Sequence, residues 1–190
     1  MNEITNVLQR PGAIAVIPTD TVYGVVARAN DTAATERLYR LKHRENKPGT
    51  LIAASIEQLV ELGIPRRYVV AVEQFWPGAV SVVIPCGPEL DYLTQGKRSL
   101  AIRLPDDPAL QELLGQTGPL ITSSANQPGE PPANTVQEAR AYFGDAVDYY
   151  QDGGDLSGRQ SSTVIRVIDD AIEVLRQGAV KINENGSIDQ

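Results

Sequence analysis

Short apolar runs, each closed by a turn signal, recur along the whole chain. They are rich in Val, Ile, Leu and Ala and have the length of strands. The segments predicted as strands are GAIAVIP (12–18), TLIAA (50–54), VSVVIP (80–85), SLAIRLP (99–105), PLITSSA (119–125), VDYYQ (147–151), STVIRVI (162–168) and AIEVLRQ (171–177).

Between these runs lie segments whose apolar residues have helical spacing. Asn30 or Asp31 can cap a helix over 32–43, which the Pro48-Gly49 pair follows. The other predicted helices are 56–62 behind Ser55, 65–75, 108–116, and 135–143, where Thr135 and Glu138 fit a capping box.

Strands that alternate with helices predict an α/β domain. The close succession of strands at 80–105 and 162–177 indicates antiparallel hairpins, so we expect a twisted mixed sheet of parallel and antiparallel strands flanked by helices. A length of 190 residues favours a single domain over 1–190. We place its core at about 10–178 and expect 181–190 to be a frayed tail.

The composition is that of an ordinary globular protein, with 42% apolar and 22% charged residues. Its apolar runs are far too short to cross a bilayer. The first residues, MNEITNVLQRPG, lack the apolar stretch of a signal peptide, and the single cysteine, Cys86, cannot form an internal disulfide. We therefore expect a cytoplasmic protein without a membrane partner.

Positive charge is concentrated in one segment of an acidic chain. The net charge is -7, yet residues 28–47 hold six Lys/Arg against three Asp/Glu. Residues 138–190 hold five against ten. The basic segment is either a solvated helix face or an anion site. Overall acidity argues against non-specific coating of nucleic acid, but a local pocket is compatible with a phosphate-bearing small molecule or one RNA.

Several familiar catalytic centres are excluded by residue counts and spacing. One histidine, His43, and one cysteine cannot build a zinc site or a Cys-His couple. No GxGxxG motif follows a strand, and GKRS (96–99) lacks the partner glycine and the Ser/Thr of a phosphate-binding loop. We identify no protein ligand for a metal.

Hydroxyl residues gather where two predicted strands end. IPTDTVYG (17–24) and TSSANQPG (122–129) both place Ser, Thr, Asn or Asp after an apolar run. Loops at strand ends bind ligands in α/β sheets, and hydroxyls there can hold an amino acid or phosphate oxygens. Each segment by itself is more typical of turn chemistry, because Ser, Thr, Asn and Asp favour turns for local hydrogen-bonding reasons.

Taken together and in order, these segments resemble the YrdC/TsaC family. The matching stretches are IPTDTVYG, LKHR, WPGAVSVV, SLAIRLP, TSSANQPGEPP, SSTVIRV and LRQG, within about residues 10–178. The resemblance implies the fold of that family, with an open concave cleft, in its short single-domain form. It also implies L-threonylcarbamoyladenylate synthase activity, a nucleotidyl transfer that converts L-threonine, bicarbonate and ATP to threonylcarbamoyl-AMP and pyrophosphate. The product would pass to downstream enzymes that form threonylcarbamoyladenosine in ANN-decoding tRNAs.

The resemblance also assigns roles to individual residues. The family's K-x-R and S-x-N motifs correspond to Lys42, Arg44, Ser124 and Asn126, the expected catalytic set, which would also bind ATP. Ser99 and Arg176 correspond to further ATP contacts. The positions that hold threonine in the family correspond to Thr21, Arg103, Thr122 and Ser162. Arg103 suits a carboxylate by bidentate pairing. Mg²⁺ is expected to accompany ATP, with no tightly bound cofactor.

The chain departs from the family pattern after Arg44. Glu45 replaces a proline, and the segment up to Lys47-Pro48 is one residue shorter than usual. The alternative function is an RNA-binding module for tRNA or rRNA maturation that uses the same basic cleft. A carbamoyl-adenylate domain of hydrogenase maturation is disfavoured by the single cysteine.

Overall fold

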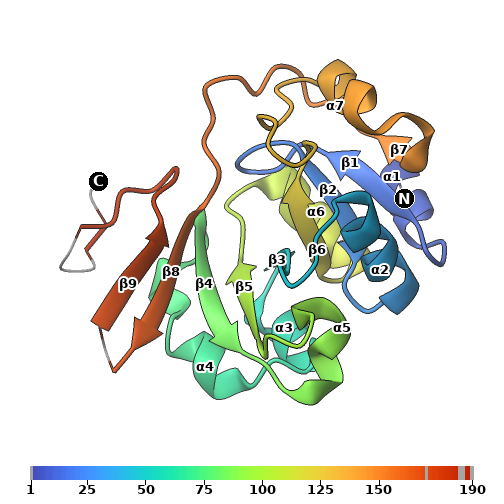
Figure 1. Ribbon diagram of the computed structural model, residues 1–190. Helices are drawn as coiled ribbons and strands as arrows, with labels where there is room; N and C mark the ends of the chain where they lie inside the picture. The colour runs from blue at the N-terminus through green and yellow to red at the C-terminus, as the bar shows by residue number, and fades with distance from the viewer. Residues whose placement is uncertain (1, 170, 184–186, 189–190) are drawn as a thin grey trace.

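The computed structural model describes residues 2–169, 171–183 and 187–188, which form one sheet with helices on both faces (Figure 1). The strands are β1 (Ile14–Ile17), β2 (Gly24–Arg28), β3 (Thr50–Ile52), β4 (Val80–Pro85), β5 (Ser99–Arg103), β6 (Leu120–Ser124), β7 (Tyr149–Tyr150), β8 (Thr163–Ile168) and β9 (Ala171–Arg176). The α-helices are α1 (Glu3–Leu8), α2 (Thr32–Leu41), α3 (Ile56–Leu62), α4 (Arg66–Val70), α5 (Asp91–Thr94), α6 (Pro108–Thr117) and α7 (Val136–Phe143).

The sheet has the strand order β7-β1-β2-β6-β3-β5-β4-β8-β9. The pairs β1/β2, β2/β6, β3/β6, β4/β5 and β8/β9 are antiparallel. The pairs β1/β7, β3/β5 and β4/β8 are parallel. The predicted mixed sheet and both predicted hairpins are thus confirmed.

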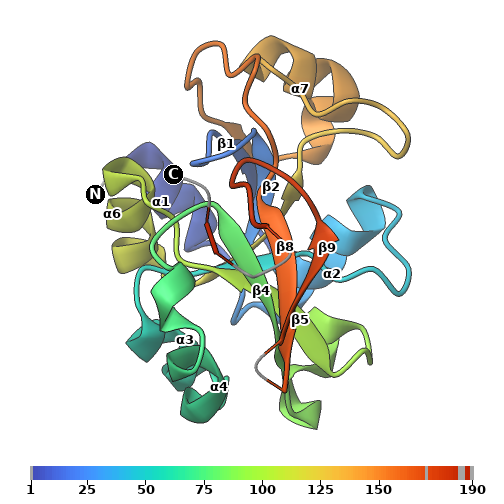
Figure 2. The ribbon, with the colours of Figure 1, turned by 90° about the vertical axis from the view of Figure 1, so that its left-hand side faces the viewer.

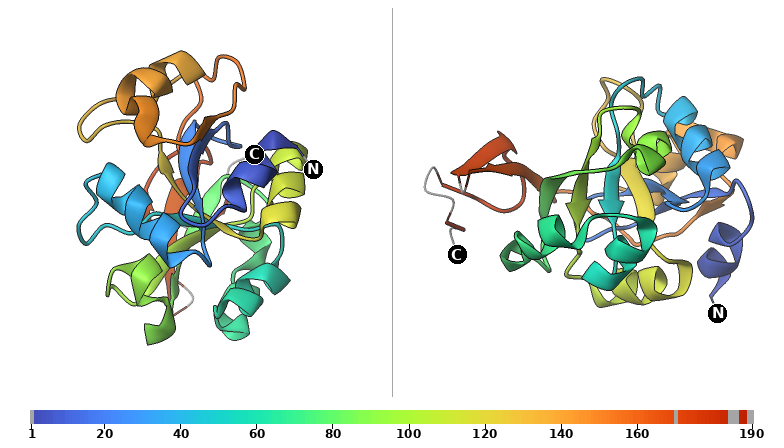
Figure 3. Two further views of the ribbon diagram at one scale, coloured as in Figure 1. Left: turned by 90° about the vertical axis from the view of Figure 1, so that its right-hand side faces the viewer. Right: turned by 90° about the horizontal axis from the view of Figure 1, so that it is seen from below.

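Helices α1, α3, α4 and α6 lie on one face of the sheet, and α2, α5 and α7 lie on the other (Figures 2 and 3). Because both faces are covered, side chains that alternate along a strand enter different apolar clusters. In β1, Ile14 and Val16 join the larger cluster, whereas Ala15 and Ile17 pack with α1 and α6. The uninterrupted apolar run of β1 follows from this two-sided burial. Among the described residues, no helix is long and apolar enough to span a bilayer.

Side-chain caps fix the starts of the main helices. Asp31, Ser55, Asp107 and Thr135 each accept a hydrogen bond from a backbone N–H in the first turn of α2, α3, α6 and α7. Glu138 differs slightly from the predicted capping box. Its Oε2 accepts from the N–H of Asn134, one residue before the cap, at 2.7 Å.

Four of the α-helices and strands differ from the sequence predictions, and among these the helices α1 and α5 were not predicted at all. The helix predicted over 65–75 is instead the short α4 followed by a separate 3₁₀ turn, Glu73–Phe75. Three of the residues around this break, Val69, Val70 and Val72, are β-branched and disfavour a continuous helix. Strand β2 was not predicted, because its sequence begins at Gly24 and reads as the end of a turn.

The segment after β9 is only partly described. Ile182 is buried against the larger cluster and forms an isolated antiparallel bridge with Ile188. Residues 184–186 and 189–190 lie outside the described residues, so the frayed tail stays a prediction for them.

Candidate functional site

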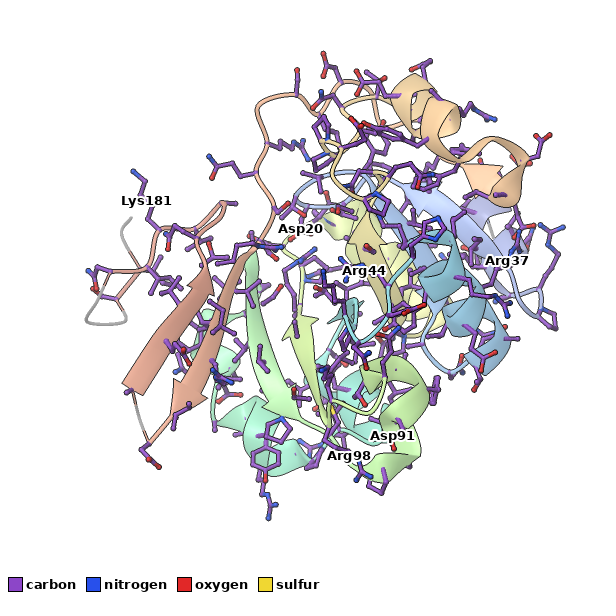
Figure 4. The ribbon with its side chains drawn as sticks, in the orientation of Figure 1. Asp20, Arg37, Arg44, Asp91, Arg98 and Lys181 are labelled. Atoms are coloured by element: carbon purple, nitrogen blue, oxygen red, sulfur yellow. The ribbon has the colours of Figure 1, made fainter. Side chains whose placement is uncertain are left out.

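A polar cleft opens where β2 and β6 meet the loop before β8 and the end of β9. Seven of the ten predicted site residues line it, although they come from six separate segments of the chain. These are Thr21, Arg44, Arg103, Thr122, Ser124, Ser162 and Arg176. Figure 4 shows Asp20 and Arg44 beside this central region, well away from the peripheral Arg37 and Lys181.

Strand pairing places the hydroxyls of β6 at the floor of the cleft. Thr122 pairs with Thr50 of β3, and Ser124 pairs with Gly24 of β2. Two glycines, Gly24 and Gly49, pass so close to Thr122 that neither position can hold a side chain. A Cβ on Gly24 would lie 2.6 Å from the Thr122 hydroxyl, and a Cβ on Gly49 would lie 2.6 Å from its carbonyl oxygen. The Tyr23-Gly24 and Pro48-Gly49 motifs therefore make room for this threonine.

Three arginines give the cleft a strongly positive interior. Arg44, Arg103 and Arg176 all line it. Burial, then the nearby charges of Arg103 and Arg44, lower the pKa of Arg176. Burial also lowers the pKa of Arg44. Like charges held together in a desolvated space favour an anionic ligand, because only its charge relieves their repulsion.

A chain of polar contacts links two of these arginines. Arg103 Nη2 donates to Asp20 Oδ1 at 2.9 Å, and Arg103 Nη1 lies 3.4 Å from Ser81 Oγ. The hydroxyls of Ser81 and Ser162 are 2.8 Å apart, and Arg176 donates to both the hydroxyl and the carbonyl of Ser162. Ser162 therefore sits between two cations in a fixed orientation.

Lys42 lies behind the cleft rather than on its surface. Its Nζ donates to the carbonyl oxygens of Ser124 and Asn126 and, at 3.0 Å, to Asn126 Oδ1. Burial and the charge of Arg44 lower its pKa to about 8. In this arrangement its three donors are satisfied by the end of β6, so Lys42 ties α2 to the S-x-N segment.

Asn126 organises the loop that follows β6. Its Oδ1 accepts from the Ser124 hydroxyl at 2.7 Å, and its Nδ2 donates to the carbonyl oxygens of Gln127 and Glu130. The K-x-R and S-x-N motifs are thus brought together as one hydrogen-bonded unit, with Arg44 and Ser124 facing the cleft.

The chain matches the family model Sua5_yciO_yrdC, described as telomere recombination, over residues 7–178. The chain belongs to this family. A putative threonylcarbamoyl-AMP synthase of Mycobacterium tuberculosis is 36% identical over 176 residues, which are 90% of this chain and 81% of the relative. The threonylcarbamoyl-AMP synthase of Bacillus subtilis is 32% identical over 91% of this chain, which spans 52% of that protein.

A solved structure, P. abyssi Sua5 complexed with L-threonine, has the same fold. The TM-score is 0.82 at 27% identity, over 93% of this chain and 53% of the other. This chain therefore spans about half the length of the B. subtilis and P. abyssi relatives.

The segment after Arg44 is held by the side chains of Arg44 and Gln95. Arg44 Nη1 donates to the carbonyl oxygens of Lys47 and Pro48 at 3.1 and 2.9 Å. Gln95 accepts from the N–H of Lys47 at 2.7 Å and donates to the carbonyl of Arg44 at 2.6 Å. Gln95 itself has a φ of 50°, an uncommon conformation for a residue with a side chain. The amide of Gln95 thus fixes the position of Arg44 relative to α5.

We expect Gln95→Ala to lower kcat/KM for ATP-dependent turnover by about tenfold. The Arg44 loop loses the two hydrogen bonds that Gln95 makes to it, and Arg44 then loses its position in the cleft. Gln111→Ala is the matched control, since its Nε2 donates to the Pro105 carbonyl away from the cleft. Steady-state kinetics of both purified variants test this. Equal effects of the two changes would contradict the positioning role.

Several hollows adjoin the cleft, and two of them contain the predicted ATP contacts Ser99 and Arg176. The cleft itself has about 70 Å³ of open space, less than a typical ligand pocket. A hollow of about 500 Å³ shares Arg176 and Ser161 with it and continues along Pro131 and Pro132. Ser99 lies instead in a hollow of about 350 Å³ that adjoins the cleft at Gly49. A nucleotide anchored in the cleft must extend outward, and the adjoining hollows at Arg176, at Gly49 and, with about 540 Å³, at Arg44 offer the space.

The described residues contain no group of three or more His, Cys, Asp or Glu side chains arranged to hold a metal. A magnesium ion that accompanies ATP takes most of its ligands from phosphate oxygens and water, so it does not require such a group.

Sequence reasoning missed several residues that shape the cleft. Ser81 and Gln95 had no recognisable signal, because their partners are far away in the sequence. Tyr23 was read as part of a turn, but its buried hydroxyl donates to the carbonyl of Gly154 and accepts from the N–H of Gly153. The sequence clue was the glycine pair Gly153-Gly154, because glycine lets the backbone approach another side chain closely.

Proposed function

We propose that this protein is a threonylcarbamoyl-AMP synthase that consumes L-threonine, bicarbonate and ATP. The observation that supports this best is the cleft with three arginines and a floor of hydroxyls, which suits a phosphate and an amino acid held side by side. Its product would be passed to enzymes that transfer threonylcarbamoyl to adenosine in ANN-decoding tRNAs. We place the reaction in the cytoplasm.

The reaction needs two bond-forming steps. In the first, the threonine amine attacks the carbon of bicarbonate, and water leaves to give the carbamate. In the second, a carbamate oxygen attacks the α-phosphorus of ATP, and the bond to the bridging oxygen breaks as pyrophosphate leaves. Negative charge builds on the α-phosphate and on the leaving group, where fixed cations stabilise it.

The described residues divide naturally between the two substrates. Arg44 and Ser124 face the cleft where the phosphates would lie, and Lys42 with Asn126 holds that segment in place. Arg103, Thr21, Thr122 and Ser162 surround the proposed threonine subsite. Arg176 is positioned to reach a nucleotide that leaves the cleft along Pro131 and Pro132. Mg²⁺ bound to the phosphates would neutralise part of their charge.

The alternative of an RNA-binding module is less well supported by the geometry. Lys42 and Arg103 are only 5% and 3% exposed, so they cannot reach the phosphates of a folded RNA lying across the surface. Direct binding of tRNA remains a prediction. Its test is a titration with tRNA at several salt concentrations, since phosphate contacts give a steep salt dependence.

Pyrophosphate release from ATP by the purified protein tests the proposed function. Threonine and bicarbonate are each supplied or omitted. Release that requires both supports the synthase. Release that does not respond to threonine contradicts it and makes RNA binding the leading hypothesis.

We expect ATP binding to weaken as the pH rises above about 8. The pKa of Lys42 in the free protein is lowered to about 8, so Lys42 is mostly charged below this pH and mostly neutral above it. Bound phosphates favour the charged form, so the dissociation constant of ATP should rise by up to about tenfold per pH unit. The pKa of Tyr39 is raised to about 12, so that residue does not titrate in this range.

The measurement is ATP affinity from about pH 6.5 to about pH 10 without threonine, which keeps the threonine amine out of the titration. A constant affinity across this range would show that Lys42 does not act on the phosphates.

A further inference from the structure

Asp20 and Arg103 form a buried ion pair at the cleft, in which Arg103 lines the cleft and Asp20 lies behind it. Their side chains are 7% and 4% exposed, and Nη2 lies 2.9 Å from Oδ1. The two residues are far apart in sequence, so only the sheet brings the loop after β1 to the end of β5. Their neighbours Thr19 and Thr21 line the cleft, as does Arg103 itself.

The pair uses only part of its bonding capacity. A carboxylate and a guanidinium can form two parallel hydrogen bonds, but here Asp20 Oδ2 and Arg103 Nε have no partner. A buried acceptor and a buried donor left unpaired are each costly, and such groups call for an explanation.

The nearest hydroxyls do not supply these missing bonds. Thr19 Oγ1 donates to the carbonyl of Val22 and lies 3.1 Å from Thr21 Oγ1. Ser81 Oγ lies beside Ser162 Oγ and the weakly bonded Nη1 of Arg103. The unpaired acceptor of Asp20 and the unpaired donor of Arg103 therefore belong to one buried ion pair, directly behind the part of the cleft that Thr19, Thr21 and Arg103 line.

An α-amino acid carries the matching pair of groups on one carbon, an amine that donates and a carboxylate that accepts. We propose that Asp20 is a specificity-determining residue that accepts a hydrogen bond from the substrate's α-amine while Arg103 binds its carboxylate. This rests on the proposed function. The contact survives carbamate formation, because the carbamate nitrogen keeps one N–H.

A purely structural ion pair makes a different prediction from amine recognition. If Asp20 only held Arg103 in place, its loss would weaken every ligand that carries a carboxylate. If Asp20 binds the amine, its loss weakens threonine far more than 3-hydroxybutanoate, which is threonine without its amine.

The test is displacement of radiolabelled L-threonine from the protein by unlabelled threonine and by 3-hydroxybutanoate. We expect the wild-type protein to prefer threonine by about 100-fold or more, and Asp20→Asn to reduce this ratio by about tenfold or more. Asp148→Asn is the matched control. Asp148 pairs with Arg37 at 2.6 Å on another part of the surface, and its loss should leave the ratio unchanged.

Each result decides between the alternatives. Equal weakening of both ligands in Asp20→Asn, or an unchanged ratio, overturns the inference. Wild-type protein that binds the two ligands equally well overturns it without any variant, which covers an Asp20→Asn protein that does not fold. If the wild-type protein releases pyrophosphate in a threonine-dependent manner, any such failure concerns Asp20 alone. Absence of both threonine binding and turnover removes the proposed function as well.

Discussion

Arg44→Ala is expected to lower kcat/KM for threonine-dependent pyrophosphate release by about 100- to 1,000-fold, because a fixed cation at the developing phosphate charge is lost. Arg44 lines the cleft, and its loop is fixed by Gln95. Burial already lowers its pKa, so the guanidinium is poorly hydrated and interacts strongly with an anion.

Arg40→Ala is the matched control for this change. Arg40 lies one helical turn earlier in α2, is exposed and does not line the cleft. We expect its kcat/KM to stay within about threefold of the wild-type value, as for most exposed charges. Ser124→Ala should resemble Arg44→Ala in direction. Equal losses at Arg40, Arg44 and Ser124 would refute the roles assigned to the K-x-R and S-x-N motifs.

Lys42→Met is expected to lower kcat/KM by about 100-fold or more while the protein stays folded. Removal of the cation releases three oxygens of Ser124 and Asn126 from their shared donor. The loop that carries both side chains then loses its position, and the phosphates lose a nearby positive charge.

Two opposing effects keep the change in stability small. Three buried acceptors lose a charged donor, which destabilises the fold, but the unfavourable burial of the ammonium group is also removed. The lowered pKa of about 8 reflects that unfavourable burial. We therefore expect the free energy of unfolding to change by less than about 2 kcal/mol.

Urea unfolding and steady-state kinetics of Lys42→Met and Lys181→Met check this prediction. Lys181 is exposed at the edge of the molecule, far from the cleft (Figure 4). If the Lys42→Met protein is unfolded, Lys42 is required for the fold and its catalytic role is contradicted. If Lys42→Met is as active as Lys181→Met, Lys42 has no role in the reaction.

The local elements follow from short-range patterns in the sequence. Asp31, Ser55, Asp107 and Thr135 begin helices because a side-chain oxygen needs only a backbone N–H three residues away. Apolar runs such as residues 14–17 become strands because both faces of the sheet are covered. The helix predicted over 65–75 was wrong because β-branched residues interrupt its helical pattern. Packing decides where the helix ends in such a segment.

The sequence predicted many of the residues at the candidate site but not the contacts between them. Seven ordered segments identified Arg44, Arg103, Ser124 and Arg176, and the sheet brings all of them to one cleft. The sequence pattern did not predict that Lys42 lies behind the cleft lining and donates its hydrogen bonds to the S-x-N segment. The pattern also assigned both Ser99 and Arg176 to ATP binding, whereas the structure places them in two different hollows.

The sequence by itself determined the starts of the four capped helices, most strands, the mixed α/β class and seven of the residues that line the cleft, because each rests on local hydrogen bonds, periodicity or ordered motifs. Only the tertiary structure decided the strand order and the buried partnership of Asp20 with Arg103. The same is true of the Gln95 contacts that hold the Arg44 loop. These depend on contacts between distant segments, whose geometry is set by packing of the whole sheet and leaves no pattern in the neighbouring residues.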